Sequence, residues 1–239
     1  MIGASITSPL GRLAMTSKPL RTYVLAPSAF GFLWEECTCC YYRHVVQNFR
    51  RPSGPFPSIF GKIDIAMKRR FAGDQWHSLG AAQPQFKIAH DEQMIRSLPI
   101  LFPGRSVAIV LRGKFDSILQ FRDGRVVVCD FKTAPIKPEN LNKYWIQLHS
   151  YAYTLERAAT GSLSIPTVDA LGLAVFEPDA FAYDGSNGAV LSGAMQWIDV
   201  SRDDARFMRF LDGVAAVLEN SEPPMPSPEC QYCRYRSAA

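Results

Sequence analysis

Two short stretches combine carboxylates with a lysine at spacings that a metal site could use. Gly113-Lys114-Phe115-Asp116 ends in one acid, and Asp130-Phe131-Lys132-Thr133 places a second acid two residues before a lysine. In a strand, Asp130 and Lys132 would share one face while Phe131 points to the other. Hard cations such as Mg²⁺ bind oxygen ligands, and a bound cation can activate water against a phosphodiester. An isolated Asp-x-Lys is more often a surface ion pair, so its structural position decides its meaning.

A second candidate metal site consists of thiols. The chain has six cysteines: Cys37, Cys39, Cys40, Cys129, Cys230 and Cys233. Cys37 with Cys40 and Cys230 with Cys233 each form a Cys-x-x-Cys pair, one near the start of the chain and one near its end. Two such pairs supply the four thiolates of a tetrahedral zinc site or an iron–sulfur cluster. This grouping differs from the disulfide framework of a small secreted domain.

Three consecutive β-rich segments must position the acids. We expect strands over Ser106–Leu111, Gly113–Phe121 and Arg125–Phe131. Asp123-Gly124 is a hairpin signal between the last two strands. The unbroken apolar run Val126–Cys129 is typical of a strand buried on both faces. A hairpin of this kind can bring Asp116 and Asp130 side by side.

Helical periodicity surrounds these strands, which predicts an α/β fold. We expect helices over Ser28–Asn48, Ser58–Phe71, Glu139–Ala159 and Ser201–Asn220, a possible short helix over Asp91–Leu98, strands over Val168–Phe176 and Gln196–Val200, and a loop or hairpin insertion over Ala180–Gly193. Ser201 is the expected N-cap of the last helix. Gln147 and Tyr151 are four residues apart on an expected helix, so they share one face.

Length and composition limit the class of protein. The 239 residues are 47% hydrophobic and 20% charged, with a net charge of +4, as in an ordinary globular chain. No apolar run reaches the roughly 18 residues of a membrane-spanning helix. We expect a flexible tail over residues 1–21, which lack the apolar core of a secretory signal, and a single domain over residues 22–239. We expect the protein to be cytoplasmic.

Taken together, these motifs resemble the PD-(D/E)xK nuclease superfamily. The likeness rests on Gly-x-x-Asp, on Asp-x-Lys-Thr at a strand end and on Gln-x-x-x-Tyr in a helix, and it covers about Pro27–Arg236. The flanking cysteines resemble the iron–sulfur branch, which includes the exonucleases of CRISPR spacer acquisition and the RecB-like nuclease domains of helicase–nucleases. The resemblance implies a restriction-endonuclease-like mixed central sheet flanked by helices, with the termini joined by a four-cysteine metal centre.

The resemblance also implies roles in catalysis. Asp116, Asp130 and the Phe131 carbonyl would bind Mg²⁺ or Mn²⁺, and Lys132 would be the catalytic lysine. Gln147 and Tyr151 match the accessory motif of the family.

The family places one more metal ligand on an upstream helix. Asp64 is our first candidate for this ligand, and His77 is the alternative. For each of them the simpler interpretation is a solvated surface residue.

For the cysteines, the resemblance implies a 4Fe–4S cluster at Cys37, Cys40, Cys230 and Cys233, with zinc as the alternative. Two ligands near each terminus depart from the commonest family arrangement, which has one near the N-terminus and three near the C-terminus, so the type of cluster stays open. Cys39 could replace Cys40, although Cys37 and Cys40 have the better chelate spacing. We expect Cys129 to be a core residue.

The implied activity is metal-dependent hydrolysis of DNA, on single strands or at DNA ends, in repair, recombination or CRISPR-type processing. A helicase or a CRISPR-adaptation complex is the implied partner. The chain has no GxxxxGK[ST] phosphate loop that could drive unwinding. A non-catalytic nucleic-acid-binding module with a zinc or iron–sulfur staple is the alternative.

Overall fold

The computed structural model describes residues 20–52, 54, 57–79, 84–133, 136–183, 185 and 188–238. Its strands are β1 (Arg21–Leu25), β2 (Phe86–Asp91), β3 (Met94–Arg96), β4 (Ile100–Leu101), β5 (Val107–Lys114), β6 (Ser117–Phe121), β7 (Val126–Lys132), β8 (Ala170–Tyr183) and β9 (Ala189–Val200). Its α-helices are α1 (Pro27–Ala29), α2 (Thr38–Val46), α3 (Ser58–Phe71), α4 (Leu141–Glu156), α5 (Asp204–Glu219) and α6 (Gln231–Ala238). The expected tail over residues 1–21 lies outside the described residues except at its end, where Arg21 opens β1.

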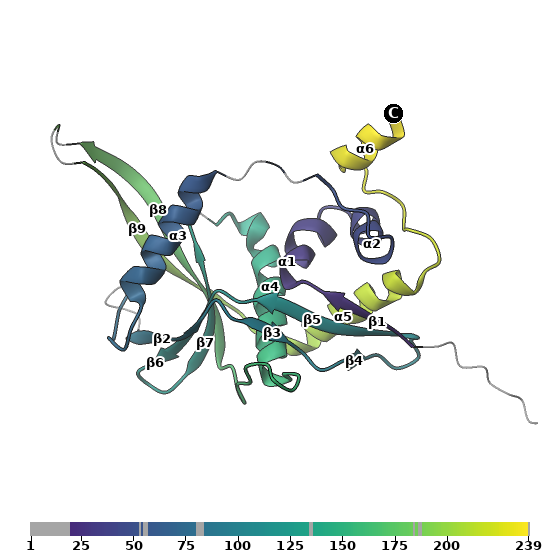
Figure 1. The fold of residues 1–239 in the computed structure, drawn as a ribbon, viewed down its shortest axis with the longest axis horizontal. Coiled ribbons are helices and arrows are strands. Elements are labelled where there is room, and N and C mark those ends of the chain that lie inside the picture. The colour runs from purple at the N-terminus through teal and green to yellow at the C-terminus, as the bar shows by residue number, and fades with distance from the viewer. Residues whose placement is uncertain are drawn as a thin grey trace, which may run out of the picture.

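The strands form two mixed sheets flanked by helices, which confirms the expected fold class (Figure 1). One sheet has the order β1-β5-β3, with β4 also paired to β5, and the other has the order β2-β6-β7-β8-β9. β7 and β8 are parallel, and α4 forms the crossover between them. Since α4 contacts strands of both sheets, it joins the two halves of the fold.

The two sheets are connected by a bend in one pair of strands. β2 and β3 follow each other in the chain, and so do β5 and β6. Because β2 pairs with β6 and β3 pairs with β5, these four strands form one ribbon that bends from one sheet into the other. At the bend, the N–H of Glu92 donates to the carbonyl of Asp116 (3.0 Å), and the N–H of Phe115 donates to the carbonyl of Gln93 (3.3 Å). Glu92 adopts a left-handed conformation with φ 44°. The short helix expected over Asp91–Leu98 is therefore wrong, because strand pairing overrides the local helical pattern there.

The structure divides the helix expected over Ser28–Asn48. A π-helical turn over Phe30–Trp34 follows α1, and the chain then reaches extended backbone at Cys37 before α2 begins. The turn packs closely on α4, because a Cβ at Gly31 would lie 2.9 Å from the carbonyl oxygen of Lys143. The next predicted helix, Ser58–Phe71, coincides with α3.

Several further differences concern the ends of elements. The N-cap of α5 is Asp203 instead of Ser201, and its carboxylate accepts a hydrogen bond from the N–H of Arg206 (2.8 Å). Over residues 180–193, where we expected a loop or a hairpin insertion, the described residues form the outer parts of β8, to Tyr183, and β9, from Ala189. They make a long two-stranded ribbon beside α3 (Figure 1). β1, β2, β4 and α6 were not predicted. Among the described helices, none combines the length and the hydropathy that a bilayer span requires.

Two apolar cores hold these layers together. The larger core lies around α4 and α5 and includes the buried side chains of Phe30, Leu111 and Leu148. The smaller core lies between α3 and the strands of the second sheet, and it includes Phe71 and Cys129. Cys129 is thus the core residue that the sequence suggested.

Gly113, the first residue of the Gly-x-x-Asp motif, lies where two elements converge on β5. A Cβ at this position would lie 2.8 Å from Cδ of Pro27 and 3.2 Å from Cε1 of Tyr151. We predict that Gly113→Ala lowers the free energy of unfolding by about 1–3 kcal/mol through overpacking. Urea denaturation measures this change.

Gly213→Ala is the matched control. Gly213 lies inside α5 with nothing within 4 Å of an added Cβ. Alanine there is expected to raise the free energy of unfolding by roughly 0.5–1 kcal/mol. Equal effects of the two substitutions would contradict close packing at Gly113.

Candidate functional site

A cleft of about 510 Å³ opens at the junction of the two sheets. Its lining residues are Phe32, Phe60, Gly61, Asp64, Asp116, Asp130, Phe131, Lys132, Thr133 and Tyr144. The cleft therefore brings the Asp-x-Lys stretch of β7 together with the acid of the Gly-x-x-Asp motif and with Asp64 of α3. Four of the residues that the sequence singled out for a divalent ion line one cavity.

Asp116 lies at the bend between β5 and β6. Its Oδ2 accepts a hydrogen bond from the main-chain N–H of Phe131 (2.7 Å), and its Oδ1 forms an ion pair with Lys68. Burial raises the pKa of Asp116, and the nearby carboxylate of Asp130 raises it further. The bend thus holds the carboxylate of Asp116 against the end of β7, next to the carboxylate of Asp130.

Asp130 and Lys132 occupy alternate positions near the end of β7. Phe131, between them, packs into the smaller core, so both charged side chains turn to the other face. Lys132 forms an ion pair with Asp130, and its Nζ lies 5.3 Å from the centre of the Tyr144 ring. Burial opposes the charge of Lys132, but Asp130 outweighs burial and raises the pKa of the ammonium. Lys132 therefore stays protonated at neutral pH.

Lys68 and Glu92 complete this charged group, and sequence reasoning missed both. The Nζ of Lys68 lies 2.8 Å from a carboxylate oxygen of Asp64 and 2.7 Å from one of Glu92, in addition to its ion pair with Asp116. Burial would lower the pKa of Lys68, but its three carboxylate partners raise it. The four-residue spacing of Asp64 and Lys68 on α3 was a usable signal for Lys68. Glu92 was hidden by the incorrect helix prediction.

The donor set in this cleft fits a hard divalent cation. Carboxylate oxygens of Asp64, Glu92 and Asp116 all lie within 4.8 Å of one another. Oxygen donors of this type suit Mg²⁺ and Mn²⁺. His77, the alternative upstream ligand, instead packs edge-on against Phe71, with ring centres 5.4 Å apart, and is not among the residues that line the cleft.

Gln147 and Tyr151 lie behind the cleft instead of lining it. The hydroxyl of Tyr151 donates to the carbonyl of Lys114 at the end of β5 (2.8 Å), and Nε2 of Gln147 donates to that hydroxyl (3.4 Å). Burial raises the pKa of Tyr151 to about 12, so the hydroxyl remains a donor at neutral pH. The pair therefore holds the strand that leads into Asp116. Tyr144, on the same face of α4, reaches Lys132 itself.

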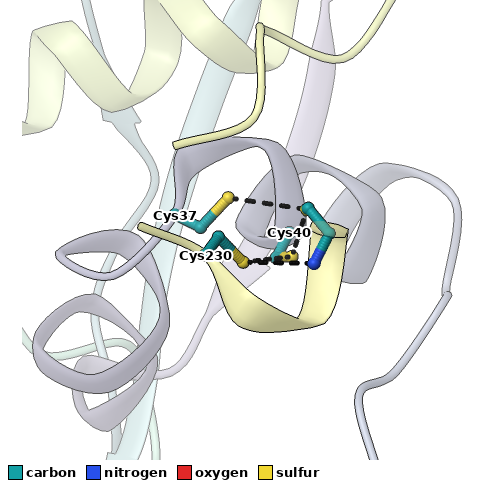
Figure 2. Close-up of side chains that lie close together, drawn as sticks. Cys37, Cys40 and Cys230 are labelled. Carbon is teal, nitrogen blue, oxygen red and sulfur yellow. Dashed lines mark hydrogen bonds between the residues drawn. The ribbon is translucent and has the colours of Figure 1, made fainter. Parts of the chain in front are cut away.

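The two Cys-x-x-Cys pairs meet outside the cleft, where the start of α2 lies beside the start of α6. Figure 2 shows Cys37 and Cys40, at the start of α2, facing Cys230 just before α6. The sulfur of Cys40 lies 3.3 Å from that of Cys233 and 3.8 Å from that of Cys230, and the sulfurs of Cys37 and Cys233 are 3.9 Å apart. All four sulfurs lie within 4.8 Å of one another, and Cys39 is outside the group.

Each cysteine pair lies at the start of a helix. Cys37 is the N-cap of α2, and Cys230 directly precedes α6, so both pairs lie at the positive end of a helix dipole. The guanidinium of Arg51 adds a positive charge, since its Nη2 donates to the sulfur of Cys230 (3.1 Å). The group thus has the sulfur ligands and the local positive charge that a thiolate-bound metal needs.

We predict that Tyr151→Phe lowers the free energy of unfolding by about 1 kcal/mol, because the carbonyl of Lys114 loses its hydroxyl donor. Tyr153→Phe on the same helix is the control and is expected to change stability less. Urea unfolding of both variants measures the difference. Indistinguishable stabilities would show that the hydroxyl does not support the end of β5.

Comparison with known proteins shows the family of this chain. The sequence model of the PD-(D/E)XK nuclease superfamily matches residues 36–238, which include the acids and Lys132 of the cleft and both cysteine pairs. The search of curated proteins finds no match. Among solved structures, the chain is similar to the crystal structure of SSO0001, with 17% sequence identity, 90% of this chain and 85% of that chain covered, and a TM-score of 0.47. Because the family match covers most of its length, this chain belongs to the PD-(D/E)XK nuclease superfamily.

Proposed function

We propose that this protein is a deoxyribonuclease that requires Mg²⁺ or Mn²⁺ and hydrolyses phosphodiester bonds in single-stranded DNA or at DNA ends. The observation that carries the proposal is the convergence of Asp116, Asp130 and Lys132 on one cleft. Membership of a nuclease superfamily supports phosphodiester hydrolysis and a nucleic-acid substrate. The choice of DNA rests on the resemblance of the motifs.

Asp116 and Asp130 would hold the divalent ion, together with the carbonyl of Phe131 and with Asp64. Such an ion polarises a phosphoryl oxygen and makes water a stronger nucleophile. The N–H of Phe131 orients the Asp116 carboxylate before any ion binds. Glu92 adds a further carboxylate beside Asp64 and Asp116.

Lys132 would act as a fixed positive charge in catalysis. Its ion pair with Asp130 and its contact with Tyr144 orient the ammonium along the floor of the cleft. Its raised pKa keeps it protonated while Asp130 is its ion-pair partner. Lys132 would stabilise the negative charge that grows on the phosphate in the transition state. The alternation of side chains along β7 keeps Lys132 beside Asp130.

By the resemblance of its motifs, the protein would act in DNA repair, recombination or CRISPR-type processing. Since the sequence has no GxxxxGK[ST] loop, unwinding of duplex DNA would come from a separate helicase or from a CRISPR-adaptation complex. The flanking metal centre, at Cys37, Cys40, Cys230 and Cys233, would join the two ends of the domain.

One observation favours a second candidate, a non-catalytic module that binds nucleic acid. The ammonium of Lys68 already contacts Asp64, Glu92 and Asp116, so part of their negative charge is offset without a metal. In a catalytic protein, a divalent ion must compete with this ammonium. Metal-dependent cleavage therefore separates the two candidates.

We predict that Lys132→Ala reduces cleavage of labelled DNA by at least about 100-fold while DNA binding persists, because the variant loses the charge that stabilises the transition state. Gel assays of cleavage and fluorescence anisotropy measure the two properties. Lys132→Gln is the second variant, since an amide can still donate to Asp130 if removal of the whole side chain harms folding.

The control for Lys132 is Lys87→Ala. Lys87 on β2 also pairs with an aspartate, Asp74, and lies 5.7 Å from the ring centre of Trp76, but it is not among the residues that line the cleft. This variant is expected to retain full activity. Full cleavage by a folded Lys132→Gln protein would contradict the catalytic role of Lys132.

We further predict that a chelator abolishes cleavage and that Mg²⁺ or Mn²⁺ restores it, because the carboxylates alone have no electrophile to offer a phosphate. Asp130→Asn is expected to stay inactive even with the metal. Binding of DNA without cleavage at any Mg²⁺ or Mn²⁺ concentration would favour the non-catalytic module.

A further inference from the structure

We propose that Cys37, Cys40, Cys230 and Cys233 bind a single zinc ion, in place of the 4Fe–4S cluster that the sequence resemblance implies. The four sulfurs belong to a site that is separate from the carboxylate cleft, and the inference does not depend on nuclease activity. It rests on how closely the sulfurs approach one another and on what holds them there.

The spacing of the sulfurs matches a tetrahedron around one ion. Zinc–sulfur bonds of ~2.3 Å place neighbouring sulfurs of a regular tetrahedron ~3.8 Å apart. Cys40 and Cys230 have sulfurs 3.8 Å apart, and Cys37 and Cys233 have sulfurs 3.9 Å apart. The sulfurs of Cys40 and Cys233 are closer, at 3.3 Å, and all four lie within 4.8 Å of one another.

A 4Fe–4S cluster does not fit this arrangement. Each cysteine of such a cluster binds a different iron, so a cube of four irons and four sulfides stands between the thiolates. The sulfurs must then lie much farther apart than around one ion. Opening the group would require α2 and the segment before α6 to separate.

The packing of α2 opposes such a separation. Tyr41 and Tyr42, which directly follow Cys40, are fully buried, and the hydroxyl of Tyr42 donates to the carbonyl of Asn220 (2.8 Å). This bond ties α2 to the chain just after α5, upstream of Cys230. α2 is therefore held in place by contacts outside the sulfur group.

Among single ions, zinc suits this set best. Four thiolates with no open position are typical of structural zinc sites, and zinc binds more tightly than Fe²⁺ to a given set of ligands. One Zn²⁺ and four thiolates carry a net charge of −2. Arg51 offsets part of this charge through its contact with the sulfur of Cys230, and the N–H of Cys233 points at the same sulfur (3.5 Å).

Metal analysis of the full-length protein tests the inference. The protein should be purified without oxygen from cells grown with ample iron, so that loss of a labile cluster cannot imitate a zinc site. We expect about one zinc per chain, almost no iron or acid-labile sulfide, and no visible absorption band. X-ray absorption at the zinc edge should show four sulfur neighbours at ~2.3 Å.

Four irons and four sulfides per chain, with a visible band that reduction bleaches, would overturn the proposal. One iron per chain without sulfide would overturn the assignment to zinc. These outcomes do not involve the carboxylate cleft, so they are distinguishable from failure of the proposed nuclease activity, which the Lys132 variants report.

Cysteine variants locate the ion. Cys40→Ser is expected to lose most of the zinc, because its sulfur lies against those of Cys230 and Cys233. Cys39→Ser is the matched control, since Cys39 is a buried neighbour outside the group of four, and it should keep about one zinc per chain. Equal retention of zinc in both variants would place the ion elsewhere. Cobalt added to the wild-type apoprotein should give the visible spectrum of a tetrahedral thiolate site, even if Cys40→Ser fails to fold.

Discussion

Carboxylates packed together in a partly buried cleft need positive charge beside them, and this need accounts for the arrangement of the site. Asp116 and Asp130 lie in one cleft with side chains that are only 15% and 7% exposed. Two charges 4 Å apart interact by about 4 kcal/mol at the effective dielectric of a protein surface. Lys68 and Lys132 supply the opposite charges, one from α3 and one from β7. These two ammonium groups offset the repulsion between the carboxylates that the cleft gathers.

The bent ribbon makes this gathering possible. A flat sheet would keep β5 and β6 in one plane, and the acid between them would lie along the sheet. The bend instead turns Asp116 toward the end of β7, where the N–H of Phe131 binds it. Glu92 lies opposite on the partner strand, and its left-handed backbone absorbs the change of direction. α4 stabilises the bend from behind, through the contact of Tyr151 with Lys114.

The sequence predicted the parts of this arrangement that depend on local pattern. Alternation in β7 correctly placed Asp130 and Lys132 on one face with Phe131 in the core, and helical spacing correctly defined α3. The division into two sheets depends on pairing between strands that are distant in the chain, and local periodicity carries no information about it. The error over Asp91–Leu98 follows from this, and it concealed Glu92. α6 is short and has little apolar character, so its position next to α2 could be inferred only from the cysteines.

The cysteine centre joins residues 37–40 to residues 230–233, and this spacing has a thermodynamic consequence. An ion bound there closes most of the polypeptide into a ring, and an unfolded chain that kept the ion would lose much of its conformational freedom. Release of the ion and cooperative unfolding are therefore linked equilibria. By mass action, the melting temperature of the protein should rise with the concentration of the free metal that the four cysteines bind. A change in the supply of that metal would thus act first on the lifetime of the folded protein.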